Sequence, residues 1–189
     1  LLDWAHPSAL LIRYNPSKST WIASAQERDI PVVEIQHGTD GVNKTEISYP
    51  FAIDGELTFP DVYFSWGQRW KQMPDFPIKD VRAVGWPFLS KMKKLFNPET
   101  QPSESILFIS QPTSADRLIP LAKSVAEDCS GDVIYRLHPN TQNSWQKTYP
   151  KLVNSDLIVD DGTKSLYEQF SKSEIQIGTT STALFEGLY

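Results

Sequence analysis

The sequence has 189 residues and a formal net charge of −5, with 40% hydrophobic and 22% charged residues. These proportions are typical of a globular protein with enough chain for one large or two small domains. The acidic balance argues against a nucleic-acid-binding protein, because such a protein would carry a basic face. One cysteine, Cys129, excludes an internal disulfide and a cysteine-rich zinc site.

No apolar run approaches the ~18 residues that a membrane-spanning helix needs, and the first residues do not form a signal peptide. The expected compartment is therefore the cytoplasm. The chain opens on Leu1 rather than Met and stops at Tyr189 within a predicted helix. We therefore expect a fragment of a longer protein.

A βαβ unit is predicted near the start of the chain. Residues 9–13 are a continuous apolar run of strand length, as buried parallel strands show. A helix that ends near Asp29 follows, in which Trp21, Ile22 and Ala25 recur at helical spacing. Residues 32–35 form the next strand, which completes the unit.

The second of these strands ends in the segment Gln36-His37-Gly38-Thr39-Asp40. Gly38 would let a backbone or a ligand approach closely. His37 is either a functional side chain or a turn histidine that bonds a carbonyl group, and its position alone does not decide between them.

The middle of the chain contains a predicted long loop over 42–60, strands over 61–66 and 81–85, and a short basic helix over 90–96. Residues 97–103 are polar and contain Pro98 and Pro102, so we place a domain boundary there. The predicted domains are therefore residues 1–96 and 104–189.

Four strands are predicted after this boundary: over 106–109, within the segment 132–140 and ending at His138-Pro139, over 157–159, and over 175–177. Helical segments alternate with them. This order predicts an α/β, Rossmann-like domain with a parallel sheet. Pro120 falls within one of the helical segments, where it must lie in the first turn or kink the helix.

Two of these strands end in polar residues that suit an anion. His138-Pro139 follows one strand, and the hydroxyl run Thr179-Thr180-Ser181-Thr182 follows another and precedes a helix. Unpaired N–H groups at a helix N-terminus bind anions, although a hydroxyl run there is equally an ordinary N-cap. Ligands of open α/β sheets bind at the carboxyl ends of the strands.

Together these segments resemble bacterial surface-carbohydrate glycosyltransferases of the two-domain GT-B fold. The resemblance is to the branch that holds sialyltransferase-like, Kdo-transferase-like and polyol-phosphate-transferase enzymes. The matching segments are IPVVEIQHG (30–38), WG (66–67), VGWP (84–87), RLHP (136–139) and STALFE (181–186).

The resemblance implies that the second domain binds the nucleotide of an activated sugar. The residues that it implies for the nucleotide phosphates are Arg136, His138, Pro139, Thr180, Ser181 and Thr182. Glu186 would accept hydrogen bonds from the ribose hydroxyls, or it is simply a favourable charge near a helix N-terminus.

The first domain would then bind the acceptor, with His37 as the catalytic base and Gln36, Gly38 and Asp40 in the acceptor-side loop. Asp160-Asp161-Gly162 is similar to the acidic-glycine motif of sialyltransferases, but it lies after the His-Pro motif, and a plain turn is favoured. No residues have metal-ligand spacing, so no metal and no cofactor are expected.

The predicted function is metal-independent transfer from a CMP- or other nucleotide-activated sugar to a saccharide or lipid-linked acceptor, in capsule or lipopolysaccharide synthesis. A lipid-linked acceptor would bring peripheral contact with the inner face of the membrane. Two alternatives stay open. One is a sugar-nucleotide 2-epimerase of the same fold, and the other is a non-catalytic nucleotide-binding domain.

Overall fold

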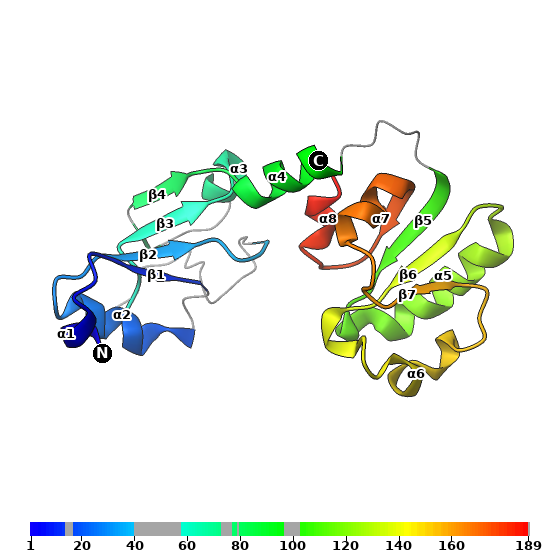
Figure 1. Ribbon diagram of the computed structural model, residues 1–189, viewed down its shortest axis with the longest axis horizontal. Coiled ribbons are helices and arrows are strands. Elements are labelled where there is room, and N and C mark those ends of the chain that lie inside the picture. The colour runs from blue at the N-terminus through cyan, green and yellow to red at the C-terminus, as the bar shows by residue number, and fades with distance from the viewer. Residues whose placement is uncertain (14–16, 40–57, 73–76, 79, 97–102, 189) are drawn as a thin grey trace. The chain divides into compact units, whose positions relative to one another are not determined.

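The computed structural model describes residues 1–13, 17–39, 58–72, 77–78, 80–96 and 103–188. They form two units, which span Leu1–Trp86 and Pro87–Tyr189 (Figure 1). Each unit contains a four-stranded parallel sheet, so the α/β class predicted from the sequence is confirmed. The predicted boundary over 97–103 falls mainly outside the described residues and stays a prediction.

The sheet of the first unit has the strand order β1-β2-β3-β4, and all its neighbouring strands are parallel. The strands are β1 (Leu10–Ile12), β2 (Val32–Ile35), β3 (Val62–Ser65) and β4 (Asp80–Ala83). The helices are α1 (Leu2–Ala5), α2 (Ser19–Gln26) and α3 (Gln68–Gln72). Ile22 and Ala25 of α2 are buried against Ile12 and Val32 of the sheet, which fixes the helix on one face.

The sheet of the second unit has the order β7-β6-β5-β8, again with parallel neighbours. The strands are β5 (Ser103–Ile109), β6 (Val133–Arg136), β7 (Ile158–Asp160) and β8 (Ser173–Ile177). The α-helices are α4 (Pro87–Leu95), α5 (Ala115–Asp128), α6 (Trp145–Thr148), α7 (Leu166–Lys172) and α8 (Ala183–Glu186). Short 3-10 helices, η2 (Pro112–Ser114), η3 (Pro139–Thr141) and η4 (Pro150–Leu152), follow strand ends or helices.

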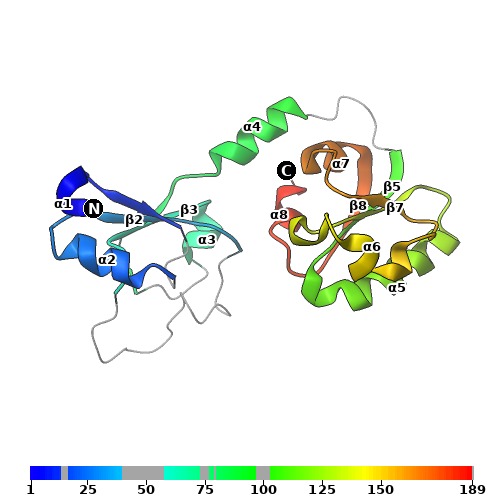
Figure 2. The same cartoon turned by 60° about the horizontal axis from the view of Figure 1, so that its bottom comes forward.

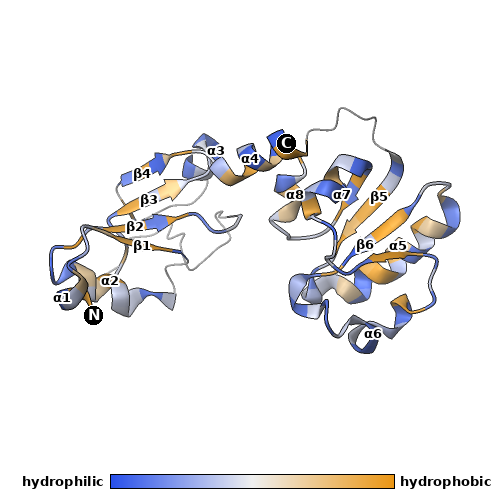
Figure 3. Cartoon of the chain, in the orientation of Figure 1, coloured by the Kyte–Doolittle hydropathy of each residue, from blue (hydrophilic) through white to orange (hydrophobic). Residues whose placement is uncertain are grey.

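Strand β5 is buried on both faces, because its side chains alternate between two hydrophobic clusters. Phe108 packs in the cluster that includes α5, whereas Leu107 and Ile109 pack with Ala183 of α8. Figures 1 and 2 show α5 on one face of this sheet, with α7 and α8 on the other. Figure 3 shows the resulting hydrophobic strands in orange. Burial on both faces explains the continuous apolar run of this segment.

The strands predicted from the sequence are confirmed, with shifts of a few residues at their ends. The helices α1 and α3 were not predicted, and both are too short to show an apolar period. The helix predicted over 90–96 begins earlier, at Pro87, whose fixed φ suits the first turn of a helix. Most of the loop predicted over 42–60 lies outside the described residues.

Pro120 lies in the interior of α5, so the predicted alternative that it occupies the first turn of the helix was wrong. The helix continues to Asp128. Because proline has no N–H, the carbonyl group of Asp116 lacks its intrahelical donor at this point.

Within the described ranges, none of the helices has the length and apolar composition that a membrane crossing requires.

Gly131 lies in the connection that leads into β6 and packs closely against the backbone of Glu104. A Cβ atom at this position would lie 1.7 Å from the backbone oxygen of Glu104. We expect Gly131→Ala to lower the free energy of unfolding by ~1–3 kcal/mol, since the strand must shift to relieve the overlap. Gly67→Ala is the control, because a Cβ there has no neighbour within 4 Å. Equal stability of the two variants in urea denaturation would contradict this packing.

Candidate functional site

Parallel pairing brings the carboxyl ends of the strands to one edge of each sheet. In the second unit, β5 leads into Ser110, β6 into Leu137-His138, β7 into Asp161 and β8 into Gly178. The residues predicted to bind the nucleotide of the activated sugar therefore lie at one edge of this sheet.

The hydroxyl run after β8 is joined to the loop after β5. Thr179 Oγ1 and Ser114 Oγ are 2.9 Å apart, and either atom can donate. Gly178 is close-packed, because a Cβ there would lie 3.3 Å from the carbonyl oxygen of Ile109 and 3.1 Å from Leu184. Thr180 is exposed beside this pair. Two adjacent strand ends thus place hydroxyl groups together.

Ser181 and Thr182 begin α8. The hydroxyl oxygen of Ser181 accepts a hydrogen bond from the backbone N–H of Ala183 at 3.2 Å. Thr182 occupies the N-cap position, and its side chain makes no capping hydrogen bond. Ser181 therefore has the capping role that the sequence left open, while Thr182 leaves its hydroxyl for another partner.

His138 has a defined ring orientation. Its Nδ1 accepts a hydrogen bond from the backbone N–H of Asn140 at 3.2 Å. Its own carbonyl accepts from Thr141 Oγ1 at 2.9 Å, and Pro139 begins the 3-10 turn η3. Because Nδ1 is the acceptor, the neutral ring carries its proton on Nε2. Nε2 has no hydrogen-bond partner within the described part of the chain, so it can donate to a ligand.

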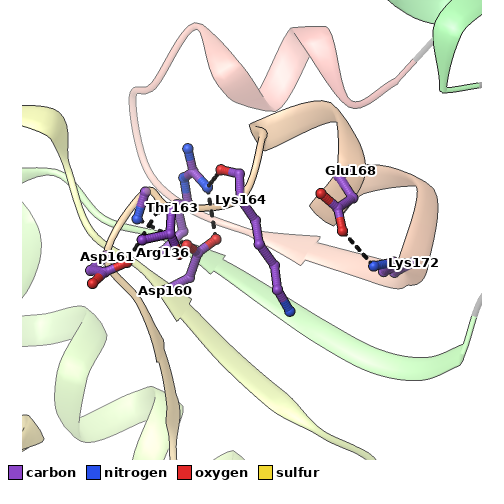
Figure 4. A network of polar contacts seen from close by, with 8 residues as sticks. Arg136, Asp160, Asp161, Thr163, Lys164, Glu168 and Lys172 are labelled. Atoms are coloured by element: carbon purple, nitrogen blue, oxygen red, sulfur yellow. Dashed lines mark hydrogen bonds and ion pairs between the residues drawn. The ribbon is translucent and has the colours of Figure 1, made fainter.

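Arg136 is held by Asp160 at the ends of β6 and β7, as Figure 4 shows. Nη1 of Arg136 donates to Asp160 Oδ2 at 2.7 Å and to the carbonyl oxygen of Lys164 at 2.7 Å. The side chains of this pair are 14% and 3% exposed, respectively. Arg136 therefore fixes the loop after β7, and at least one of its nitrogens is occupied by protein atoms.

The segment Asp160-Asp161-Gly162 forms the plain turn that the sequence favoured. Oδ1 of Asp160 accepts from Gly162 N at 3.0 Å, and Oδ1 of Asp161 accepts from Thr163 N at 3.2 Å. Gly162 has a φ of 92°, which favours glycine. Both carboxylates thus stabilise the turn. Among the described residues, no group of three or more His, Cys, Asp and Glu could hold a metal ion.

Glu186 contacts a residue that the sequence did not indicate. The hydroxyl group of Tyr167 on α7 donates to Glu186 Oε2. Burial, followed by the bond to Glu186 and its charge, raises the pKa of the Tyr167 phenol, so this hydroxyl keeps its proton. The tyrosine orients the carboxylate and leaves Oε1 for another donor.

Aromatic rings surround Tyr167. Its ring centroid lies 5.9 Å from that of Phe88, 6.3 Å from that of Phe96 and 6.0 Å from that of Phe170. A small cavity of about 130 Å³ adjoins this cluster and is lined in part by Glu186. The contacts of Tyr167 with Phe88 and Phe96 could not be predicted from the sequence, because these residues are distant from it along the chain.

In the first unit, buried Gln36 fixes the loop that carries His37. Its Nε2 donates to the carbonyl oxygen of Gly38 at 2.8 Å, and its Oε1 accepts from Trp66 N at 2.7 Å. The amide thus ties the end of β2 to the end of β3. Asp40, which the sequence placed in this loop, lies outside the described residues.

His37 itself is exposed and lines a cavity of about 630 Å³ in the first unit. The other described residues that line this cavity belong to β1, to the segment just after it, and to α2 and the residues just before that helix: Leu10, Leu11, Ile12, Arg13, Ser17, Lys18 and Trp21. The sequence singled out neither Arg13 nor Lys18. From the sequence, His37, His138 and Ser181 each follow a strand, which predicts that they open onto one cleft between two α/β units. This stays a prediction, because the two units are not placed relative to one another.

Aromatic side chains also gather at the ends of β3 and β4. Trp66 and Trp86 stack with centroids 3.8 Å apart and an interplanar angle of 9°. Trp70 of α3 meets Trp66 edge-on at 5.9 Å. Gly85, with a φ of 85°, allows the turn that places Trp86 on Trp66. This stack explains why tryptophans follow both strands.

Three solved structures show which fold these units form. UDP-N-acetylglucosamine 2-epimerase from Rickettsia bellii aligns at a TM-score of 0.61 with 14% identity, over 98% of this chain and 54% of that chain. UDP-GlcNAc 2-epimerase from Methanocaldococcus jannaschii gives a TM-score of 0.54 at 10% identity, and the alignment covers 98% of this chain and 60% of that chain. MurG from Acinetobacter baumannii gives a TM-score of 0.54 at 10% identity, over 99% of this chain and 51% of that chain.

The chain has a GT-B-like fold. The predicted fold is therefore confirmed, and the family to which the chain belongs stays a prediction. The chain spans between 51% and 60% of the length of these three proteins. No family model matches the sequence, and no curated protein matches it.

The buried ion pair can be tested by its effect on stability. Asp160→Ala leaves the Arg136 guanidinium buried without its partner, so we expect the free energy of unfolding to fall by ~3–5 kcal/mol. Arg136→Met in the same chain should recover much of that loss. The control is Asp80→Ala, which breaks an exposed pair with Arg82 and should leave the free energy of unfolding nearly unchanged. Similar losses for the buried and exposed pairs in urea denaturation would show that Asp160 is unimportant.

Proposed function

We propose that the protein is a glycosyltransferase that uses a nucleotide-activated sugar for the synthesis of a surface polysaccharide. The observation that carries this proposal is the orientation of His138. Its Nε2 is available as a donor at the sheet edge that also presents the hydroxyl run after β8. The GT-B-like fold supports the same class of enzyme.

The roles of the residues that bind the nucleotide sugar follow from the charge on the leaving group of the reaction. Glycosyl transfer leaves a nucleotide phosphate, whose growing negative charge must be stabilised by hydrogen-bond donors. His138 Nε2–H would donate to this phosphate, and the hydroxyl groups of Thr180, Ser181 and Thr182 would add further donors. Pro139 and Arg136 contribute by fixing the loops on either side, and the positive charge of Arg136 is compensated by Asp160.

Glu186 would bind the ribose of the same nucleotide. Tyr167 occupies Oε2, and the remaining carboxylate oxygen can accept from a ribose hydroxyl. This contact selects a ribonucleotide, because a 2′-deoxyribose lacks one of the hydroxyl groups that a carboxylate accepts from.

The acceptor side is the loop that Gln36 fixes. His37 would remove the proton from the acceptor hydroxyl as the glycosidic bond forms, which is general base catalysis. Gly38 and Asp40 complete the acceptor-side loop of this proposal. The acceptor is a saccharide or a lipid-linked saccharide, and the enzyme would then act in the cytoplasm at the inner face of the membrane.

The second candidate is a sugar-nucleotide 2-epimerase, which the similarity of fold favours equally. An epimerase removes and returns a proton within the sugar and needs carboxylates beside it. In the second unit, Asp160 and Asp161 stabilise their own turn. Product analysis with a labelled sugar nucleotide separates the two, since only a transferase releases the nucleotide together with a glycosylated acceptor.

A thermal-shift screen with CMP, CDP, UDP and GDP identifies the nucleotide, because a ligand at ~100 times its dissociation constant adds ~2.7 kcal/mol of stability.

With that nucleotide, His138→Ala should lower the affinity by ~10- to 150-fold, since it removes a hydrogen bond to a charged phosphate worth ~1.5–3 kcal/mol. His6→Ala is the matched control, because His6 also precedes a proline but does not follow a strand. Unchanged affinity of His138→Ala in calorimetry would remove the main support for this function.

His37→Ala should leave nucleotide affinity unchanged and lower the turnover number by ~100- to 10,000-fold. A base acts only as the acceptor proton leaves, so its loss affects the rate of transfer rather than ground-state binding. A transfer assay beside calorimetry measures both. If His37 has only a structural role, the variant will instead melt at a lower temperature, and its folded fraction will turn over at the normal rate.

Chelation with EDTA should leave nucleotide binding unchanged, because this proposal uses only N–H and O–H donors at the phosphates. The check is calorimetry with the nucleotide before and after chelation. Loss of affinity that Mg²⁺ or Mn²⁺ restores would show that a carboxylate such as Asp161 holds a metal ion with the nucleotide.

A further inference from the structure

The cavity beside His37 has the size of a ligand site. Its volume of about 630 Å³ lies within the ~300–1,000 Å³ range of small-molecule pockets. It lies at the carboxyl end of β1, where Arg13 follows the strand, and it extends to Lys18 and Trp21 at the start of α2. This is the edge of the sheet where ligands of parallel α/β sheets bind.

Among the described residues, the charged side chains that line this cavity are both basic. Arg13 and Lys18 form no ion pair and no side-chain hydrogen bond with any other described residue, and no Asp or Glu is among the lining residues that the structure describes. Glu34 lies on the neighbouring strand β2, but it is buried and does not line the cavity. In a chain whose net charge is −5, two cations that no described residue pairs create a local positive potential in a concave site, and this potential attracts an anion.

Apolar surface lies next to these cations. Leu11 is 62% exposed and Trp21 is 45% exposed, and both line the cavity. An indole ring offers a flat apolar face to the C–H groups of a sugar ring, while its N–H stays available for a hydroxyl group. A guanidinium and an ammonium group beside such a ring suit a saccharide with a charged substituent better than an inorganic ion.

We propose that this cavity binds a saccharide that carries a phosphate or carboxylate group, with Arg13 and Lys18 holding the anionic group and Trp21 contacting the sugar ring. The identification of this saccharide as the acceptor that His37 activates rests on the proposed transferase function. Under that function the acceptor is anionic, and Arg13 and Lys18 determine acceptor specificity.

The test compares pairs of ligands that differ only in charge, using the full chain and NMR-detected titration. Glucose 6-phosphate and glucuronic acid are the anionic probes, glucose is the neutral probe, and inorganic phosphate is the probe for the anion alone. We expect at least one anionic sugar to bind at least ~10-fold more tightly than both glucose and inorganic phosphate, with amide shifts at Arg13, Lys18 and Trp21. The charge-assisted contacts should also weaken in 0.5 M salt, in line with a Debye length that falls from ~10 Å at 0.1 M towards ~3 Å at 1 M.

Variants then assign the contacts. Arg13→Ala and Lys18→Ala should each lower the affinity for the preferred anionic sugar by ~10-fold and leave the affinity for glucose unchanged. Arg69→Ala and Lys71→Ala are matched controls, because these cations are exposed on α3 of the same unit and do not line the cavity. Trp21→Ala should weaken both charged and neutral sugars, since it removes the surface for the ring.

The outcomes separate this inference from the proposed function. If glucose or inorganic phosphate binds as tightly as the anionic sugars, or if Arg13→Ala and Lys18→Ala bind like the controls, the inference is wrong, whatever nucleotide the second unit binds. If the anionic sugar binds through Arg13 and Lys18 while no nucleotide binds, the anionic saccharide site stands and the transferase function is wrong.

Discussion

Parallel strand pairing is the constraint on which the rest of this structure depends. Each parallel pair needs a crossover between its strands, and in both units the crossovers bring the carboxyl ends of the strands to the same sheet edge. Residues far apart in sequence, such as Ser114 and Thr179, become neighbours for this reason alone. The chemistry at such an edge is set by the few residues that follow each strand, so a short loop sequence decides what each unit binds.

Both units fix these loops with a buried polar side chain that joins two strand ends. Gln36 ties β2 to β3 in the first unit, and the Arg136–Asp160 pair ties β6 to β7 in the second. Burying a polar group costs free energy unless its hydrogen-bonding atoms find partners. Each of these side chains is therefore compatible with only a few conformations of the loop that it contacts. These contacts hold the loop of His37 and the residues after β7 in defined positions. Polar contacts beneath the sheet edge therefore position these loops, together with the hydrophobic packing of the strands.

The strands could be predicted because burial on both faces leaves a continuous apolar run, as in residues 106–109. The positions of His37 and His138 at strand ends followed from those runs. The contacts of these residues could not be predicted, because they join segments that only the folded chain brings together. Tyr167 lies 19 positions before Glu186 and on another element, and no local pattern links the two. Arg13 and Lys18 gave no signal either, since a single cation after a strand is indistinguishable from an ordinary surface charge.

The aromatic cluster around Tyr167 has a consequence for the evolution of this fold. Phe88 lies on α4 and Phe96 just beyond its end, and both rings contact the tyrosine that orients Glu186. Substitutions of residues in contact are rarely additive, because each changes the space that its neighbour can occupy. Under the proposed function, in which Glu186 binds the ribose, replacements on α4 that touch no ligand can therefore change the ligand preference. Compensating changes in divergent relatives would then accumulate on that helix, and a laboratory selection for a new nucleotide would find its second-site suppressors there.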